Sequence, residues 1–442
     1  MSTNLRNPAD RRDYPARWTM RRGKELFREI DERSADGSEE LLSVSHITGI
    51  TPRSQKNVTM FQSESLVGYK ICRPGDIAAN TMWTWQGAIG VSDYFGVISP
   101  SYNVYRQRQD TYNPRYLDFL LREPKLVDVY YSLSTGIRPS RRRLYPDEFL
   151  TIRFPVPPRV EQDKIVRFLD EKANAIDEVI ATRQKQIDEL HELRKTIINR
   201  AVTRGISRAE GAVREGACPH APSNARRLGT AALPNGWKAV RMREAFTFRK
   251  GLSITKANLE ETGIPVVSYG QIHSKDNSGT TLLDSFFRFV NESYLKTDKS
   301  AVVQSGDFIF ADTSEDVPGC GNCVYVDRDD VIFAGYHTII AHPVDKPRNK
   351  YLAYYFQSQL WRDQVWKTVC AVKVYSITQR LLRDTLIVLP RAAEQREIAA
   401  YLDEKCAAID KAIENRKAAI EELVALKARI VADAVTGRME VE

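Results

Sequence analysis

The chain contains two copies of one long segment. Glu161 to Thr203 and Glu394 to Thr436 align without a gap, and roughly half of the aligned positions are identical. The spacing between the copies is the length of a whole domain and much longer than a solenoid repeat. The sequence therefore predicts a duplicated domain rather than an array of small repeats.

Weaker similarities precede each copy in the same order. Each half has an opening Pro-x-x-Trp motif, a short apolar stretch, and a Gly-Asp pair that an apolar residue follows. The matching stretches are Pro15 to Trp18 with Pro234 to Trp237, Leu41 to Ser45 with Ile264 to Ser268, and Arg73 to Ile77 with Gln304 to Phe308. Each half is therefore predicted to be one domain followed by one long helix.

Apolar residues in each copy recur at alternating steps of four and three, which is a heptad pattern. Neither copy contains proline or glycine within this run. Basic residues occupy the same two steps of the pattern in each copy, as Arg183 and Arg194 and as Arg416 and Lys427. The predicted helix–helix seam consists of Ile176, Ile180, Ile187, Leu190 and Ile197 in the first copy, and Ile409, Ile413, Ile420, Leu423 and Ile430 in the second.

A helix of this length is stable only if its apolar stripe is buried. The simplest partner for each seam is the other seam, although packing on the helix's own domain is an alternative. If a pseudo-two-fold axis relates the halves, the helices pair antiparallel. A seam of roughly 25 residues then spans ~40 Å, at 1.5 Å per residue.

The segments before the helices have a different pattern. Short apolar runs broken by Gly, Pro, Asp and Asn are typical of strands and loops, and helical patches lie between them. The predicted fold class is α+β, with two domains joined by two long antiparallel coiled-coil helices. The predicted boundaries are a first domain 1–155, a first helix 156–204, a linker 205–232, a second domain 233–390 and a second helix 391–442.

Composition limits the classes of protein. A chain of 442 residues exceeds one ordinary core, and its formal charge of +8 permits binding to nucleic acid without proving it. No apolar run is long enough to span a bilayer, and the N-terminus lacks the apolar core of a secretory signal. Six cysteines in a chain of this size do not suggest a disulfide framework. We therefore expect a cytoplasmic protein.

Catalytic signatures are weak. The chain has no Gly-x-x-x-x-Gly-Lys-Ser/Thr loop for ATP. The stretch Asn113 to Tyr116 is similar to the Asn-Pro-Pro-Tyr motif of amino-methyltransferases, but Arg115 interrupts it, and a turn that opens a helix is favoured. Asp170 to Lys172 recurs as Asp403 to Lys405 within the repeated helices. Solvated surface charges or a partner contact explain this set better than a nuclease site does.

Two cysteines and two histidines have nearly the spacing of a zinc finger. They are Cys320, Cys323, His337 and His342. A finger would need a helix that carries both histidines, whereas the pattern around them predicts strands. The first half also has no counterpart of these residues. We therefore predict no metal site, and metal analysis of the purified chain would test this.

Candidate DNA-contacting residues are basic or polar. Phosphate contacts use Arg, Lys and small polar groups, and base readout favours Arg, Lys, Asn and Gln. Each basic run is also compatible with an ordinary solvated surface. The predicted DNA-binding residues are Arg138, Ser140, Arg141, Arg142 and Arg143 in the first half, and Arg249, Lys250, Lys256, Lys373 and Tyr375 in the second.

The motifs of the repeated segment together resemble a known family. Each copy begins with Pro-x-x-x-Glu-Gln-x-x-Ile, continues with Leu-Asp-Glu-Lys and a heptad helix, and ends with Ala-Val-Thr. The first copy runs from Pro157 to Thr203 and the second from Pro390 to Thr436. This arrangement, twice per chain, resembles the specificity subunit of type I restriction-modification enzymes, and the resemblance covers essentially the whole chain.

The resemblance implies that each domain is a target-recognition domain that reads one half of a split site on double-stranded DNA. It implies that the helices space the domains and dock two methyltransferase subunits. S-adenosylmethionine would bind to those partners, and a motor-nuclease subunit would add translocation and cleavage that depend on ATP and Mg²⁺. This chain would itself hold no cofactor, catalyse no step and contact no membrane.

The second half departs from the family's pattern. Gly136 to Arg138 is close to the family's Gly-x-Arg before the last strand, whereas the second half has Cys370 to Lys373 and keeps only a basic residue. Two other classes stay open: a coiled-coil adaptor for proteins or RNA, and a self-contained methyltransferase or nuclease. The sequence gives neither the recognised bases nor the spacer length, nor whether a nuclease subunit is present.

Overall fold

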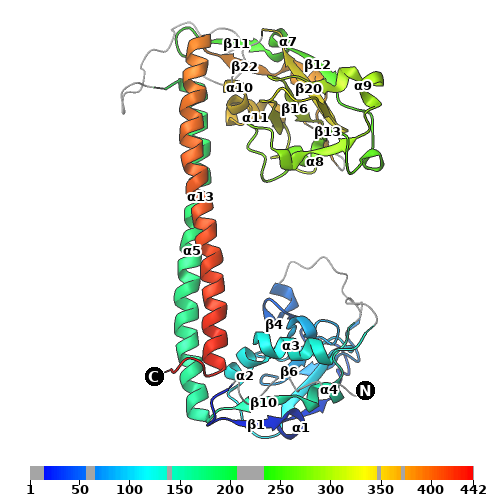
Figure 1. Ribbon diagram of the computed structural model, residues 1–442, viewed down its shortest axis with the longest axis vertical. Coiled ribbons are helices and arrows are strands. Elements are labelled where there is room, and N and C mark those ends of the chain that lie inside the picture. Colours follow the sequence, from blue (N-terminus) through cyan, green and yellow to red (C-terminus); the bar gives the residue numbers. More distant parts are fainter. Residues whose placement is uncertain are drawn as a thin grey trace. The chain divides into compact units, whose positions relative to one another are not determined.

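The structure is a computed structural model that describes residues 14–55, 65–136, 142–206, 233–345, 350–369 and 374–441. It divides into two compact units (Figure 1). One comprises Met1–Arg183 and Lys417–Glu442, and the other comprises Gln184–Arg416. Each unit therefore contains one mixed domain and a portion of each long helix. The predicted α+β class is confirmed.

The first domain is built on an antiparallel four-stranded sheet of order β2-β9-β6-β7, and β1 pairs with β10. Its elements are β1 (Thr19–Arg22), α1 (Gly23–Leu26), β2 (Phe27–Ile30), β3 (Leu42–Ser45), β4 (Gly49–Pro52), β5 (Lys70–Cys72), β6 (Ile77–Ala79), the 3-10 helix η3 (Thr84–Gln86), β7 (Ile89–Val91), β8 (Gly96–Ile98), β9 (Asn103–Gln107), α2 (Pro114–Leu121), α3 (Pro124–Leu133), α4 (Pro146–Thr151) and β10 (Arg153–Val156).

The second domain has a sheet of order β12-β20-β16-β18, and β11 pairs with β22. Its main elements are β11 (Lys238–Arg241), α7 (Met242–Ala245), β12 (Phe246–Lys250), β13 (Ile264–Val267), α8 (Tyr269–Ile272), β14 (Arg288–Val290), α9 (Tyr294–Thr297), β15 (Val302–Val303), β16 (Phe308–Ala311), β17 (Thr313–Ser314), β18 (Cys323–Tyr325), β19 (Ile332–Ala334), β20 (Thr338–Pro343), α10 (Tyr351–Tyr355), α11 (Gln359–Trp366), β21 (Tyr375–Ser376), α12 (Gln379–Asp384) and β22 (Leu386–Leu389).

The two sheets have the same topology. In the first domain β2 and β6 flank β9, and in the second domain β12 and β16 flank β20. The fourth strand of each sheet pairs antiparallel with the third, as β7 does with β6 and β18 with β16. Both sheets bury aromatic side chains: Tyr105 stacks on Phe149 at 4.4 Å between ring centres, and Phe308 lies edge-on to Phe356 at 5.0 Å. The second domain adds a sheet of order β14-β13-β19-β15. The sequence repeat is therefore also a repeat of fold.

The repeated segments form α5 (Arg159–Arg204) and α13 (Ala392–Val435), which lie side by side (Figure 1). Within the second unit, Arg194 Nε lies 3.4 Å from Asp410 Oδ1, and Arg416 Nε donates to Gln186 Oε1 at 3.0 Å. The earlier residue of α5 thus contacts the later residue of α13. This order shows that the helices are antiparallel, as predicted for two halves related by a pseudo-two-fold axis.

The predicted seam residues are all buried or half-buried, whereas most positions between them are exposed. In the first unit, Lys427 Nζ forms an ion pair with Asp177 Oδ2 at 2.6 Å. The gapless alignment of the copies makes this pair the counterpart of Arg194 with Asp410. Each unit therefore repeats the same cross-helix contact. Within the described ranges, no helix is both long and apolar enough to cross a membrane.

Candidate nucleic-acid interface

The opening Trp of each domain is tied to the first turn of the helix that follows it. Trp18 Nε1 donates to Glu161 Oε2 at 3.0 Å, and Trp237 Nε1 donates to Glu394 Oε2 at 3.1 Å. A carboxylate in the first turn also suits the positive end of the helix dipole. The two repeated motifs, Pro-x-x-Trp and Glu-Gln, are therefore the two sides of one structural joint.

The glutamine of the same motif forms a hydrogen bond with the backbone just before the helix. Gln162 Nε2 donates to the carbonyl of Pro157 at 3.0 Å, and Gln395 Nε2 donates to that of Pro390 at 2.9 Å. The proline carbonyl lies in a buried bend, and the glutamine amide supplies the donor that this acceptor needs. The spacing Pro-x-x-x-Glu-Gln is thus explained by backbone satisfaction and needs no catalytic role.

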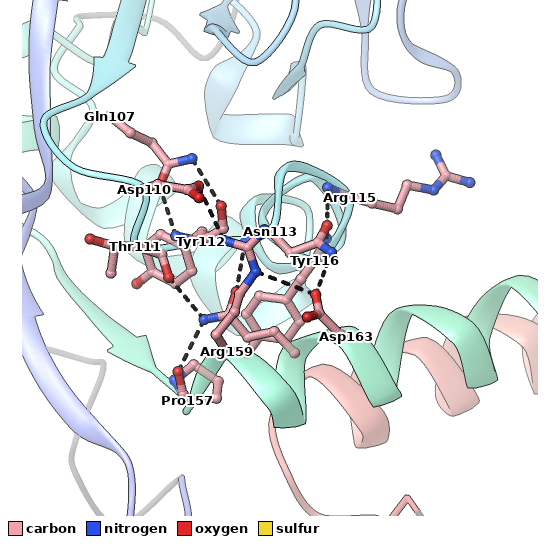
Figure 2. Close-up of polar contacts among 11 residues, drawn as sticks. Gln107, Asp110, Thr111, Tyr112, Asn113, Arg115, Tyr116, Pro157, Arg159 and Asp163 are labelled. Atoms are coloured by element: carbon pink, nitrogen blue, oxygen red, sulfur yellow. Dashed lines mark hydrogen bonds and ion pairs between the residues drawn. The ribbon is translucent and has the colours of Figure 1, made fainter.

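Figure 2 shows that the stretch Asn113 to Tyr116 is part of the same joint. Asn113 caps α2, because its Oδ1 accepts from the backbone N–H groups of Arg115 and Tyr116. Its Nδ2 donates to Asp163 Oδ1 on α5 at 2.7 Å, and this bond is the largest cause of a lowered pKa at Asp163. The structure therefore uses this methyltransferase-like stretch as a helix cap, as the sequence favoured.

The Ala-Val-Thr ends of the helices dock against tyrosines of the domains. Tyr116 Oη donates to the carbonyl of Val435 at 2.9 Å, whereas Tyr351 Oη donates to the carbonyl of Val388 at 2.9 Å and lies 3.4 Å from that of Val202. Both phenols are fully buried. Each compact unit thus consists of a domain that holds the start of the helix it leads into and the end of the other helix.

One end of each main four-stranded sheet is a candidate binding surface. In the first domain this end lies where β6 stops and β9 begins. The chain returns to it after α3, because the backbone N–H of Leu144 donates to the carbonyl of Thr81 at 3.2 Å. In the second domain the N–H of Ile377 donates to the carbonyl of Asp312 at 2.8 Å, just beyond β16. We call these equivalent regions the sheet ends.

Arg142 and Arg143 lie at the first sheet end, and Arg138, Ser140 and Arg141 fall outside the described residues. The guanidinium of Arg142 stacks on the ring of Tyr131 at 4.2 Å and donates to that residue's carbonyl at 3.1 Å. The side chain of Arg143 is exposed. The structure therefore places Arg142 on an aromatic side chain and leaves its neighbour Arg143 exposed.

Sequence reasoning missed the aromatic residues at the first sheet end. Trp83 is 42% exposed and stacks on Trp85 at 6.2 Å, and Trp85 in turn contacts the ring of Tyr131 at 5.9 Å. Arg142 continues this row of planar groups. A Trp-x-Trp pair in a short loop between two strands was a visible signal, because large aromatic residues are rarely left exposed without a partner.

The second sheet end contains two of the predicted residues, and the rings of Tyr269, Tyr336 and His337 contact one another there. The exposed Lys250 ends β12, which pairs with the start of β20, and Tyr375 begins β21, which pairs with β17. Lys373 falls outside the described residues. Asp312, Tyr269 and His337 also lie at this end. The sequence did not indicate the first two as candidates, and it indicated His337 only as a possible metal ligand. Nothing in the spacing of Asp312 and Tyr269 distinguished them from ordinary loop residues.

Arg249 and Lys256 have different surroundings. Arg249 Nη2 donates to the fully buried Asp307 at 3.2 Å, so its guanidinium is used inside the domain, and its contact with DNA stays a prediction. In the first domain Asp76, the counterpart of Asp307, forms an ion pair with Arg106 of β9 at 2.6 Å, and the strand register places Arg106 at the position of His342. The repeated Gly-Asp pair thus anchors a basic side chain to each sheet. Lys256 is exposed in a short 3-10 helix.

The cysteines and histidines with finger-like spacing are engaged separately. Burial raises the pKa of Cys323 to about 12, which keeps its thiol neutral, whereas zinc binds the thiolate. His342 Nδ1 lies 2.6 Å from Asp307 Oδ1, and His337 Nδ1 lies 3.1 Å from Asp312 Oδ1. Among the residues with a described position, no three metal-ligating side chains converge. The two histidines are therefore used in separate hydrogen bonds to carboxylates.

The paired domains, the antiparallel helices and the repeated joints define a class: two-domain proteins with an internal repeat. Residues 234–422 match the family model described as type I restriction modification DNA specificity domain. The type I restriction enzyme MjaVIII specificity subunit of Methanocaldococcus jannaschii is 22% identical over 78% of this chain and 75% of its own length.

One solved structure extends the likeness of fold to nearly the whole chain. A chain from work on complex assembly and conformational transition of the type I R-M system has a TM-score of 0.67 and 19% identity, over 96% of this chain and 99% of its own. The HsdS subunit from Thermoanaerobacter tengcongensis has a TM-score of 0.48 and 20% identity, over 96% and 98%. Residues 234–422 therefore carry a type I restriction modification DNA specificity domain, and the chain as a whole is similar to type I specificity subunits over most of its length.

Proposed function

We propose that this chain selects the DNA sequence for a type I restriction-modification complex. Each domain reads one half of a bipartite, asymmetric site on double-stranded DNA. The observation that carries the proposal is the equivalence of the two sheet ends: the backbone is the same, whereas the side chains differ. Two readers with one framework and different surface chemistry are suited to two different half-sites.

The chain contributes sequence choice, and the partner subunits perform the chemistry. The candidate catalytic stretch Asn113 to Tyr116 is used as a cap, and Asp170 and Lys172 form surface ion pairs with Arg115 and Glu171. We assign S-adenosylmethionine to two methyltransferase subunits. We assign ATP and Mg²⁺ to restriction-translocase subunits that join the complex in the cytoplasm.

The outer faces of the helices support docking of two identical partners. Leu193 on α5 is 46% exposed, and its counterpart in the repeat, Leu426 on α13, is 41% exposed. Neither residue belongs to the seam. An exposed leucine at the same step of both copies offers the same apolar contact twice, and this repetition fits a partner that binds in two copies.

Co-purification with the methyltransferase subunit tests the assembly. The wild-type chain is expected to bind two copies, and Leu193→Glu or Leu426→Glu is expected to bind one, because a charge replaces one apolar contact. The control is Val179→Glu, which replaces another exposed apolar residue of α5 that has alanine as its counterpart. A chain that binds no methyltransferase, but captures unrelated proteins or RNA, would favour the adaptor class.

Replacement of Arg141, Arg142 and Arg143 by alanine tests the first sheet end. Phosphate contacts release counterions, so the loss of each contact lowers the slope of log affinity against log salt by roughly 0.9. We expect the triple variant to bind specific DNA more weakly in the assembled complex and with a smaller slope. Unchanged affinity and slope would remove these arginines from the interface.

A further inference from the structure

We propose that His337 is a base-reading residue of the second domain, and that Asp312 positions it by fixing its tautomer. The inference rests on the proposed DNA-recognition function and adds a residue that decides specificity. His337 has a φ of 55°, and among the described residues it is the one non-glycine residue with a positive φ. Such a conformation is strained for a side chain with a Cβ, and strain of this kind is concentrated at functional sites.

Core packing does not account for the strain. The side chain of His337 is 56% exposed, so the fold gains little from burying it. Glycine would adopt the same backbone without cost. A histidine at this position therefore indicates a use for the imidazole itself.

The imidazole is held from several directions. Asp312 Oδ1 lies 3.1 Å from Nδ1, and this carboxylate also accepts from Thr313 Oγ1 at 2.7 Å. The rings of Tyr269 and Tyr336 meet the imidazole edge-on at 5.4 and 6.0 Å between centres. An exposed side chain that is fixed in this way loses little conformational entropy when it binds.

The contact with Asp312 determines what the ring offers. A carboxylate accepts and does not donate, so Nδ1 carries the proton of the neutral ring, and Nε2 is left as an acceptor. Within the described part of the chain, no group hydrogen-bonds to Nε2. In the major groove, the amino groups of adenine N6 and cytosine N4 are the donors that such an acceptor would recognise.

His337 lies among the other candidate contacts of the second sheet end. It directly precedes β20, where the backbone N–H of Gly251 donates to the carbonyl of Thr338 at 3.1 Å. This pairing brings the exposed Lys250 beside the start of β20. A lysine for phosphate and a positioned acceptor for a base are the two kinds of contact that a recognition surface combines.

The first domain has no such device at the equivalent position. In the first domain Thr81 occupies the position of Asp312, and Ser101 occupies that of His337. Thr81 Oγ1 donates to the carbonyl of Ser101. The backbone of Asp312 is likewise bonded to that of His337, at 3.0 Å. The His337–Asp312 pair therefore belongs to one half-site only, and its loss should change one half of the recognised sequence.

The test maps methylated sites produced by the complete complex with His337→Gly. Glycine keeps the positive φ without strain, so the variant should fold at least as stably as the wild type. We expect the first half-site to stay intact and one position of the second half-site to become degenerate, with discrimination there falling roughly 2- to 13-fold, as for the loss of one neutral hydrogen bond. Asp312→Asn should relax the same position more weakly, because the ring stays but its tautomer is no longer fixed.

The matched control is Lys296→Ala, an exposed residue on α9 of the same domain. It should leave both half-sites unchanged. Wild-type preference at every position in His337→Gly would overturn the inference and leave the proposed function standing. A wild-type complex without any bipartite preference would instead overturn the proposed function, and the inference with it.

Discussion

Gly437 shows how one residue closes a joint between a domain and a helix. It ends α13 with a φ of 68°, and a Cβ at this position would lie 2.8 Å from Cζ2 of Trp18 and 2.5 Å from Pro15. We expect Gly437→Ala to lower the free energy of unfolding by at least ~2 kcal/mol, because the left-handed backbone alone costs about 1–2 kcal/mol. Denaturant titration measures this loss.

Two further glycines separate the cost of the left-handed backbone from the cost of the steric contact. Gly68 has a φ of 79° with nothing within 4 Å of a Cβ, so Gly68→Ala isolates the backbone cost. Gly205 ends α5 with the same φ, and a Cβ there would lie 3.4 Å from Trp237. The expected order of destabilisation is Gly437, then Gly205, then Gly68. An equal loss at Gly437 and Gly68 would show that contact with Trp18 does not matter.

Asp163 makes the same joint sensitive to acid. Its pKa lies below the ordinary value of 3.8, chiefly because it accepts from Asn113 and secondly from Arg159. Since the folded-state pKa is lowered, the stabilisation is complete above pH 3.8 and is lost as the pH falls through the folded-state pKa. Asp163→Asn should therefore be less stable than the wild type at about pH 6, and the difference should shrink towards about pH 3.

Chemical denaturation of both proteins across that range measures the difference. Asp188→Asn, at an exposed position of α5 away from the joint, is the control and should show a flat difference. A difference for Asp163→Asn that does not change with pH would mean that its ionised form is not what the joint binds.

The two long helices repeat their cross-helix contacts, with one exception. Arg416 donates to Gln186, but the counterpart of Gln186 in the second copy is Ala419. Arg183, the counterpart of Arg416, has a buried Nε without a hydrogen-bond partner among the described residues. A buried donor that is left unsatisfied costs free energy, so this is a weak point of the seam.

Ala419→Gln should supply the missing acceptor and raise the free energy of unfolding by about 0.5–1.5 kcal/mol. Ala418→Gln makes the same chemical change at an exposed neighbour and should have almost no effect, since alanine and glutamine both favour helix. Gln186→Ala should destabilise the chain, because it recreates the same defect at Arg416. Equal effects at positions 418 and 419 would exclude the hydrogen bond as the cause.

Helices were the most predictable elements, for a physical reason. A heptad stripe such as that of Ile187 and Leu190 fixes both the helix and the face that it buries, because the period is local in sequence. The meeting of Trp18 with Glu161, or of Tyr116 with Val435, depends on tertiary distance that no local period encodes. The motifs were visible as repeats, and their role as joints required the structure.

At the scale of the whole molecule, duplication provides two domains of one topology with different surfaces. The basic residues at the sheet ends could be predicted as candidates, since charge and residue type are visible in sequence. Arg249 could not be separated from Lys250 in this way, although the structure turns the first inwards to Asp307 and leaves the second exposed. Neither Trp83 nor His337 could be placed beside these candidates, because strand pairing alone brings them together.

The central claim is that the two domains read their half-sites independently. The most direct measurement replaces residues 233–390 with the recognition domain of another specificity subunit and maps the methylated sites of the assembled complex in cells. The account predicts that one half of the bipartite sequence changes, while the other half and its methylated base stay the same. A change in both halves, or in neither, would contradict it.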